Sequence, residues 1–479
     1  MKKYAIIAFL AMSSAELFAF CGFYVAKADA KIFNKTSQVI LVRDGDYSVV
    51  TMSNDFKGDV KDFAMVVPVP VVLNRQDIRT VNPGVFSKLD AYSGPRLVEY
   101  HDQNPCYPPM VDRYLMNTEM VQESMAPTMM RGNKKEKDYK VTIEAEYKVD
   151  EYDILILSAK ESTGLKAWLT DNGYKIPGTA AEVLDPYIKN NLKFFVVKVD
   201  AERLSQKNNG KMSPLQISFN SPKFMLPIRL GMANADGDQD MIVYGLTKSG
   251  RIECTNYRTV EMPTARKIPT FVRNDFGNFY KDLFDKAYKY QGRNAVFLEY
   301  AWNVSPSFRG MKCDPCVGPP PISTDLAQAG VYWNGNVHFT RLHVRYSKEK
   351  FAQDLFFQVT PNKENFQSRY IITNPARGPF DCKEGQSYLQ QVVNRRQNEL
   401  AELQALTGWT GANHPNYVKG YKNLMKESPD KNEIVLPITN PKDDGFLPKF
   451  IFSFAMVLSV LLLLSKSIIG LFKRRTAAL

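Results

Sequence analysis

Apolar and polar residues alternate along several short segments, which predicts β-strands with one face on a core. The clearest case is 140–147, whose apolar face consists of Val141, Ile143, Ala145 and Tyr147. Elsewhere apolar residues recur three or four positions apart, which predicts helices, the longest at 387–406. Because both patterns interleave along the chain, we predict an α+β fold with a mixed, largely antiparallel sheet and several helices.

The other expected strands are short apolar runs bounded by turn residues. They cover 37–42, 47–52, 63–73, 152–157, 194–199, 215–219, 224–230, 241–246, 295–302, 332–346 and 351–359, and further helices cover 76–95, 164–172, 179–190 and 278–290. The first two runs flank Asp44-Gly45, which predicts a hairpin. Pro68 and Pro70 confine the run at 63–73 to a sheet edge or end it, because proline donates no ladder hydrogen bond.

The N-terminus carries a separate apolar pattern. Two lysines precede an apolar run at 4–12, and small residues lead up to Ala19. This order predicts a secretory signal peptide at 1–19. The run is too short to cross about 30 Å of hydrocarbon as a helix. Lipid attachment at Cys21 is disfavoured, because the bulky Phe20 stands directly before it.

The C-terminal apolar run predicts a membrane anchor. Residues 450–472 contain a single charged side chain, and their length suits one transmembrane helix. Lys473, Arg474 and Arg475 follow at once, and a basic cluster beside a span marks the cytoplasmic side. We therefore expect a single-pass protein of the inner (cell) membrane, held by the lipid bilayer, with a basic cytoplasmic tail at 473–479 and its ectodomain outside the cytoplasm. A sorting signal that is removed by processing has the same layout and is the alternative.

The region between the two ends is long enough for two or three domains. We expect an N-terminal part at 20–250 with a long loop at 106–138, a C-terminal part at 251–407, and a spacer at 408–449 rich in Gly, Pro, Asn and charge. With 44% hydrophobic and 12% aromatic residues, the chain is expected to fold. Its net charge of +12 is spread along the sequence, whereas nucleic-acid binders gather basic residues on one face, so nucleic acid is not an expected partner.

The cysteines all lie in the part expected outside the cytoplasm, where disulfides are the usual state. The disulfide candidates are Cys21, Cys106, Cys254, Cys313, Cys316 and Cys382, and their pairing is left open. Cys313-Asp-Pro-Cys316 has the spacing of a redox pair, but the prolines after it cannot start the helix that lowers the pKa of a redox thiol. We favour a structural loop disulfide. Thiol–disulfide or zinc chemistry at this pair is the alternative.

Two further patterns suggest metal ions, and both are incomplete. A Met-rich segment offers thioethers, which select Cu(I), but it lacks the repeated motifs of copper carriers and is expected to be a flexible or partner-binding loop. Its methionines are Met110, Met116, Met120, Met125, Met129 and Met130. Asp236-Gly-Asp238-Gln-Asp240 begins like a calcium loop, yet no Gly follows Asp240 and no acid stands at the twelfth position. We interpret it as a turn between strands.

Histidines are few, namely His101, His338, His343 and His414. Because His338 and His343 are five apart on an expected strand, they point to opposite faces, which disfavours joint binding of one ion from a regular strand. The sequence contains no His-Glu-x-x-His, no Gly-x-Ser-x-Gly and no phosphate-binding glycine loop. We therefore assign no catalytic residue, no cofactor and no cofactor-binding residue, and leave the metal content open.

Several strings together resemble a bacterial family of exported proteins known as a domain of unknown function. They are Cys21-Gly-Phe-Tyr-Val, Asp55-Phe-Lys-Gly, Val66-Val-Pro-Val-Pro70, Gly164-Leu-Lys-Ala-Trp-Leu169, Asn172-Gly-Tyr-Lys-Ile-Pro177, Phe224-Met-Leu-Pro-Ile-Arg-Leu-Gly231 and Cys313-Asp-Pro-Cys316. The likeness extends from about residue 20 to about residue 390. It implies bacterial origin, export and often a C-terminal span. It implies no activity, cofactor or catalytic residue.

The leading hypothesis is a non-enzymatic envelope protein that presents a binding or scaffolding surface to a protein partner outside the membrane. The rival hypothesis is a thiol–disulfide or metal-handling protein that uses Cys313 and Cys316, with copper or zinc as the metal. A hydrolase of envelope polymers would need paired carboxylates in a cleft.

Overall fold

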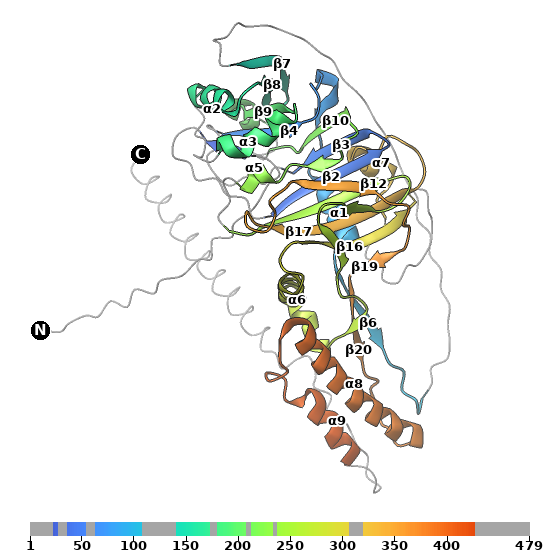
Figure 1. The fold of residues 1–479 in the computed structure, drawn as a ribbon. Coiled ribbons are helices and arrows are strands. Elements are labelled where there is room, and N and C mark those ends of the chain that lie inside the picture. Colours follow the sequence, from blue (N-terminus) through green and yellow to red (C-terminus); the bar gives the residue numbers. More distant parts are fainter. Residues whose placement is uncertain are drawn as a thin grey trace, which may run out of the picture. The chain divides into compact units, whose positions relative to one another are not determined.

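The computed structural model describes residues 23–26, 36–53, 63–107, 140–172, 180–206, 212–232, 237–305 and 320–426. The chain divides into two compact units (Figure 1). Unit 1 comprises Met1–His101, Val111–Asn374 and Arg396–Pro415, and unit 2 comprises Asp102–Met110, Pro375–Arg395 and Asn416–Leu479. The signal peptide expected at 1–19, the span expected at 450–472 and the basic tail lie outside the described residues. Within them, no helix is long and apolar enough to cross a membrane.

Unit 1 contains a nine-stranded sheet, counted over the described residues, with the order β14-β16-β17-β12-β2-β3-β10-β5 and β19 beside β16. Its strands are β2 (Thr36–Asp44), β3 (Tyr47–Met52), β5 (Ile78–Thr80), β10 (Leu215–Asn220), β12 (Gln239–Thr247), β14 (Arg258–Glu261), β16 (Ala295–Val304), β17 (Val337–Tyr346) and β19 (Phe366–Gln367). The strands come from both sides of residue 250. β2 and β3 form the expected antiparallel hairpin. β12 runs parallel to β2, which joins chain segments some two hundred residues apart.

A second, five-stranded sheet of unit 1 has the order β1-β4-β9-β8-β7. Its strands are β1 (Phe23–Ala26), β4 (Phe63–Val69), β7 (Val141–Val149), β8 (Tyr152–Ala159) and β9 (Lys193–Val199). β4 is an inner strand, and the described part of β1 pairs with its residues 63–66. Among the described residues, Pro68 has β9 alone as a neighbour, which suits a residue without an N–H.

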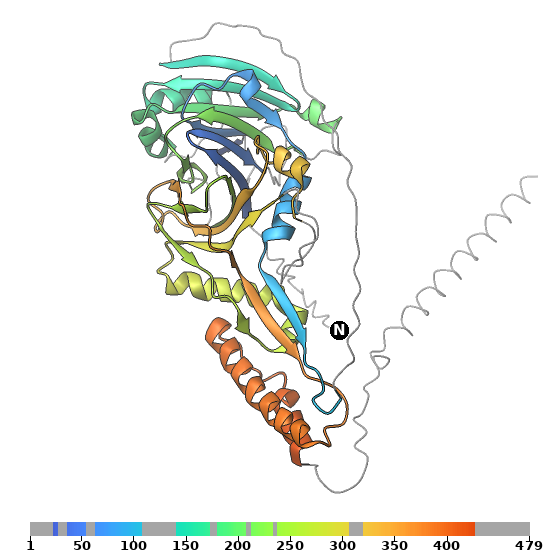
Figure 2. The same ribbon diagram turned by 90° about the vertical axis from the view of Figure 1, so that its right-hand side faces the viewer.

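Two three-stranded sheets complete the β-structure that is described. One has the order β11-β18-β13 and the other β15-β20-β6. Their strands are β6 (Arg96–His101), β11 (Met225–Leu226), β13 (Ile252–Cys254), β15 (Arg266–Lys267), β18 (Leu355–Val359) and β20 (Arg369–Asn374). Figure 2 shows the parallel pair β6 and β20 side by side. The expected strand at 224–230 is wrong beyond β11, because a helical turn, α5 (Arg229–Met232), follows Pro227.

The described helices lie in both units. They are α1 (Gly84–Ser93), α2 (Ser162–Asp171), α3 (Ala180–Lys189), α4 (Ala201–Ser205), α6 (Phe276–Tyr290), α7 (Ser323–Gln328), α8 (Lys383–Thr407) and α9 (Asn416–Lys426), with 3₁₀ turns η2 (Arg75–Asp77) and η4 (Thr270–Asp275). α8 contributes residues to both units. α9 falls within the segment that we expected to be a spacer.

Four apolar clusters, counted over the described residues, hold unit 1 together. The largest lies between the two large sheets and joins Val39 of β2 to Val67 of β4 and Phe195 of β9. A second cluster packs α2 and α3 on the five-stranded sheet. The third packs α1 and α7 on the other face of the nine-stranded sheet, and the fourth joins α6 to β16 and β20. The predicted α+β class with mostly antiparallel pairing is confirmed.

Unit 2 is held by a disulfide between Cys106 and Cys382, which are 276 residues apart in the sequence. Asp102 accepts hydrogen bonds from the Tyr388 hydroxyl and from Arg395 Nη2, each at 2.6 Å. These contacts fasten residues 102–107 to the start of α8 by a covalent bond and a charged hydrogen-bond pair.

Candidate functional site

One face of β17 carries three basic side chains, Arg341, His343 and Arg345, because alternate residues of a strand share a face. Glu299 of β16 faces Arg341 and His343, and Asp240 of β12 faces His343 and Arg345. Basic and acidic groups therefore alternate across three neighbouring strands. We call this set of five residues the ion-pair chain.

Glu299 is the centre of the ion-pair chain. It accepts hydrogen bonds from Arg341 Nε at 2.6 Å, from His343 Nδ1 at 2.9 Å and from the Tyr280 hydroxyl at 2.5 Å. A β-bulge between Leu298 and Tyr300 turns its side chain toward these partners. Burial alone would raise the pKa of Glu299, but Arg341 and His343 lower it to about 2, so the carboxyl is ionised.

His343 lies between two carboxylates. Its Nε2 is 3.3 Å from Asp240, which also accepts two hydrogen bonds from Arg345 at 2.8 and 2.9 Å. Burial opposes the charge, yet Glu299 and Asp240 raise the pKa of His343. The Phe284 ring stacks on the imidazole at a centroid separation of 3.8 Å, and the imidazole is 14% exposed. Because its nitrogens and its face are occupied, the ion-pair chain is a structural device that fixes three strands.

A more accessible site lies at the end of β2 and β12. It is a pocket of about 350 Å³. Its lining residues are Arg43, Asp44, Gly45, Pro222, Phe224, Lys248, Ser249, Phe357, Gln358 and Val359. We call it the Arg43–Lys248 pocket. Its volume falls at the lower end of the range of small-ligand sites, about 300 to 1,000 Å³.

The sheet topology explains why these residues meet. β2 and β12 are parallel neighbours with Arg43 opposite Thr247, so the residues that follow both strands emerge at the same edge of the sheet. Asp44 and Lys248 are thereby placed side by side and form an ion pair. β18 and β11 supply the opposite wall, where the Phe357 N–H donates to the Phe224 carbonyl at 2.8 Å.

Arg43 is an anchored cation. Its side chain is 7% exposed, and its Nη1 donates to the Ser48 hydroxyl at 2.7 Å and to the Ser221 carbonyl at 2.9 Å. Its guanidinium lies over the Phe224 ring, 5.1 Å from the centroid. The partnering carboxylate, Asp46, is 3.2 Å away and 67% exposed. Burial lowers the pKa of Arg43, because a weakly paired charge is held out of water.

Lys248 is a more accessible cation, with a side chain that is 44% exposed. Its ammonium pairs with Asp44 and lies over the rings of Tyr332 and Trp333, at 5.5 and 5.0 Å from their centroids. Asp44 also accepts a hydrogen bond from the Tyr332 hydroxyl at 2.5 Å. The hydrogen bonds from Lys248 and Tyr332 lower the pKa of Asp44, so it is ionised near neutral pH.

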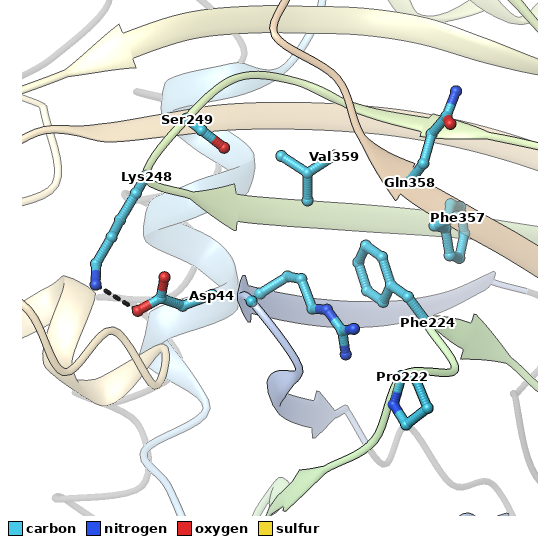
Figure 3. A pocket seen from close by; sticks show the side chains of 10 residues that line it. Asp44, Pro222, Phe224, Lys248, Ser249, Phe357, Gln358 and Val359 are labelled. Carbon is cyan, nitrogen blue, oxygen red and sulfur yellow. Dashed lines mark hydrogen bonds and ion pairs between the residues drawn. The ribbon is translucent and has the colours of Figure 1, made fainter.

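Figure 3 shows the two halves of the pocket: Lys248 and Asp44 at the left, and Phe224 and Phe357 at the right, with Val359 between them. One half is charged and the other is apolar. Such a lining can bind a molecule with one anionic group and one apolar part.

Residues 15–358 match the family model described as "Uncharacterized protein conserved in bacteria (DUF2330)". The chain belongs to the DUF2330 family. This confirms the resemblance to a bacterial domain-of-unknown-function family that the sequence strings indicated. No curated protein and no solved structure matches this DUF2330 chain.

The disulfide candidates of the DUF2330 chain separate into three groups. Cys106 and Cys382 are paired. Cys254 is a buried thiol without a sulfur partner among the described residues, and its Sγ contacts Asn256 Oδ1 at 3.3 Å. Cys21, Cys313 and Cys316 lie outside the described part of the chain, as does the Met-rich segment from Met110 to Met130.

The histidines are dispersed. The side chains of His338 and His343 lie on opposite faces of β17, as the spacing predicts. His101 is exposed near Glu99, and His414 stacks on Phe271 at 3.8 Å. No group of three or more His, Cys, Asp or Glu side chains able to hold a metal ion occurs among the residues the structure describes.

The calcium-like segment leads into a strand. Gly237 has a positive φ of 83°, which fits the expected turn, and Asp240 is committed to the ion-pair chain. Asp236 lies outside the described residues.

Neither the ion-pair chain nor the Arg43–Lys248 pocket was predicted from the sequence. The signal for the pocket is the polar turn Arg43-Asp44-Gly45-Asp46, which reads as an ordinary hairpin turn. Only the parallel pairing of β2 with β12 reveals that Lys248 joins it.

Proposed function

We propose that this DUF2330 chain is a membrane-anchored, extracytoplasmic binding protein of the bacterial envelope and not an enzyme. Residues 450–472 anchor it in the inner membrane, and Lys473, Arg474 and Arg475 lie on the cytoplasmic side. The ectodomain binds its ligand in the Arg43–Lys248 pocket and faces an envelope partner outside the cytoplasm.

The disulfide between Cys106 and Cys382 is the observation that carries the export part of this proposal. Disulfides persist in the bacterial periplasm and are rare in the cytosol, where thiols are kept reduced. The signal peptide at 1–19 supplies the route.

The binding part rests on the pocket. Arg43 is held by four oxygen acceptors and an aromatic ring, so its charge is fixed before any ligand arrives. Preorganised groups of this kind lower the entropy lost on binding.

Cysteine accessibility tests the topology. Tyr290→Cys places a thiol on a side chain that is 87% exposed in unit 1, and Ala477→Cys places one in the tail. A membrane-impermeant maleimide reagent is applied to spheroplasts of cells that express the full-length protein. We expect the Tyr290→Cys variant to be labelled in intact spheroplasts and the Ala477→Cys variant only after lysis. Labelling of Ala477→Cys in intact spheroplasts, or of Tyr290→Cys only after lysis, contradicts the proposed orientation.

A deletion of residues 450–479 tests the anchor. We expect the shortened chain to move from the membrane pellet to the soluble periplasmic fraction, with its disulfide intact on a non-reducing gel. A shortened chain that still sediments with the membrane contradicts anchoring by this helix.

A further inference from the structure

We propose that the Arg43–Lys248 pocket binds a small organic anion whose carboxylate displaces Asp44 from Lys248 and whose apolar part packs on Phe224 and Phe357. This inference rests on the binding function proposed above and names the chemical class of the ligand.

The charges of the pocket favour an anion. Arg43 and Lys248 both line it. The carboxylate nearest to Arg43 is that of Asp46, which is mostly exposed and lies 3.2 Å from Arg43 Nη2. Lys248 has an accessible ammonium, whereas Arg43 is buried and held by hydrogen bonds to Ser48 and Ser221. A ligand anion would therefore be drawn into the pocket by the fixed charge of Arg43 and would make its direct charged contact with Lys248.

Asp44 marks the position where the ligand carboxylate would lie. Its carboxylate accepts from Lys248 and from the Tyr332 hydroxyl, so Asp44 keeps one partner when it loses the other. An incoming carboxylate can thus replace Asp44 at Lys248 without leaving Asp44 unpaired. Asp44 therefore competes with the ligand carboxylate for Lys248, and removal of its charge should strengthen the binding of an anion.

The opposite wall selects an apolar part. Phe224 and Phe357 have ring centroids 5.5 Å apart, and Pro222 and Val359 extend the same wall. Phe224 also stacks on Arg43, which keeps its ring in place. A pocket of about 350 Å³ admits a molecule the size of an aromatic carboxylate. A bare inorganic anion would leave this wall without a contact.

Binding to full-length protein in detergent tests the inference, with three probes: 3-phenylpropanoate, its uncharged amide 3-phenylpropanamide, and inorganic phosphate. Titration calorimetry or ligand-observed NMR at millimolar probe concentration gives the affinities. We expect 3-phenylpropanoate to bind about tenfold more tightly than the amide, since a charge-assisted hydrogen bond contributes more than a neutral one. Phosphate is expected to bind more weakly than 3-phenylpropanoate.

Three variants locate the site. Lys248→Gln should weaken 3-phenylpropanoate about tenfold and leave the amide unchanged, whereas Asp44→Asn should tighten 3-phenylpropanoate. Lys348→Gln removes an equal charge from an exposed residue outside the pocket and should change neither affinity. Thermal unfolding of each variant shows whether it is folded.

The outcomes separate this inference from the proposed function. If the acid and the amide bind equally and Phe224→Ala abolishes both, the anionic ligand class is wrong while a binding pocket remains. If no probe binds to folded protein, the inference is overturned, and the anchored topology is still decided by the labelling and deletion experiments. If Lys248→Gln weakens the acid and Asp44→Asn tightens it, the inference is supported.

Discussion

The ring of Phe284 in α6 stacks on the imidazole of His343 in β17, with centroids 3.8 Å apart. The stacking places a helix over the ion-pair chain and removes the charged groups from water. Glu299 is 1% exposed and Arg341 is 8% exposed. In such surroundings each charge depends on its partner, because an unpaired buried charge is costly.

Glu299→Gln should destabilise unit 1 strongly. The substitution preserves the size of the side chain but leaves Arg341 and His343 without their shared carboxylate. Removal of one partner from a buried ion pair typically costs about 3 to 5 kcal/mol in the free energy of unfolding. Urea denaturation followed by tryptophan fluorescence measures the change.

The matched control is Glu161→Gln. Glu161 pairs with Lys140, and both side chains are more than half exposed. We expect a change below about 1 kcal/mol, because exposed ion pairs contribute little. Equal destabilisation by the two variants would show that burial of the ion-pair chain does not matter.

His338 should make the protein less stable in acid. It is 2% exposed, neither ring nitrogen has a hydrogen-bond partner among the described residues, and burial lowers its pKa to about 4. Because the unfolded chain binds this proton near pH 6.5 and the folded chain only near pH 4, the contribution of His338 to the free energy of unfolding falls as pH drops between these values. The loss reaches about 3 kcal/mol below pH 4.

His338→Val should remove that part of the pH dependence. The slope of the unfolding free energy against pH, measured by urea denaturation between pH 7 and pH 4, is expected to be shallower in the variant than in the wild type. His101→Val is the control, because His101 is exposed, and it should leave the slope unchanged. A wild-type slope in the His338→Val variant would show that His338 is not held neutral.

The ion-pair chain illustrates which structural features sequence patterns predict and which they do not. The β2–β3 hairpin was predictable because its two strands and its turn are adjacent in sequence. Strand alternation also placed His338 and His343 on opposite faces of β17. The partners of His343 were not predictable, since Asp240 and Glu299 reach β17 from strands on either side of it.

The pocket could not be predicted for the same reason, because Asp44 and Lys248 meet through a parallel pairing of distant strands.

The helix α9 was missed for a different reason. Its apolar residues Tyr417, Val418, Tyr421, Leu424 and Met425 have helical spacing. The surrounding Gly, Pro and Asn residues obscured this local signal.

Cys254 should resist alkylation in the folded protein. Its thiol is 8% exposed, and burial raises its pKa, which reduces the reactive thiolate. Non-reducing mass spectrometry after iodoacetamide treatment should find Cys254 unmodified in native protein and modified in guanidinium. The peptides of Cys106 and Cys382 should be recovered as one linked pair in both samples. Rapid native modification of Cys254, or linkage of Cys106 to another cysteine, contradicts the structure.

Gly250→Ala should disturb the turn that carries Lys248. A Cβ at Gly250 would overlap the Thr360 carbonyl oxygen and lie 2.8 Å from that of Asn362, so the backbone after β18 would have to move. Overpacking of this kind costs about 1 to 3 kcal/mol. We expect a lower melting temperature and, because the 247–250 turn positions Lys248 and Ser249, weaker binding of 3-phenylpropanoate.

Gly277→Ala is the control for this prediction. Gly277 lies in the first turn of α6, and a Cβ added there would meet no atom within 4 Å, so an alanine has room. Alanine is the better helix former by about 1 kcal/mol, and the melting temperature should stay the same or rise. If Gly250→Ala is as stable as Gly277→Ala and still binds 3-phenylpropanoate normally, the close packing of the 247–250 turn against residues 360–362 does not hold Lys248 in place. The position of the cation would then have to come from its contacts with Asp44, Tyr332 and Trp333.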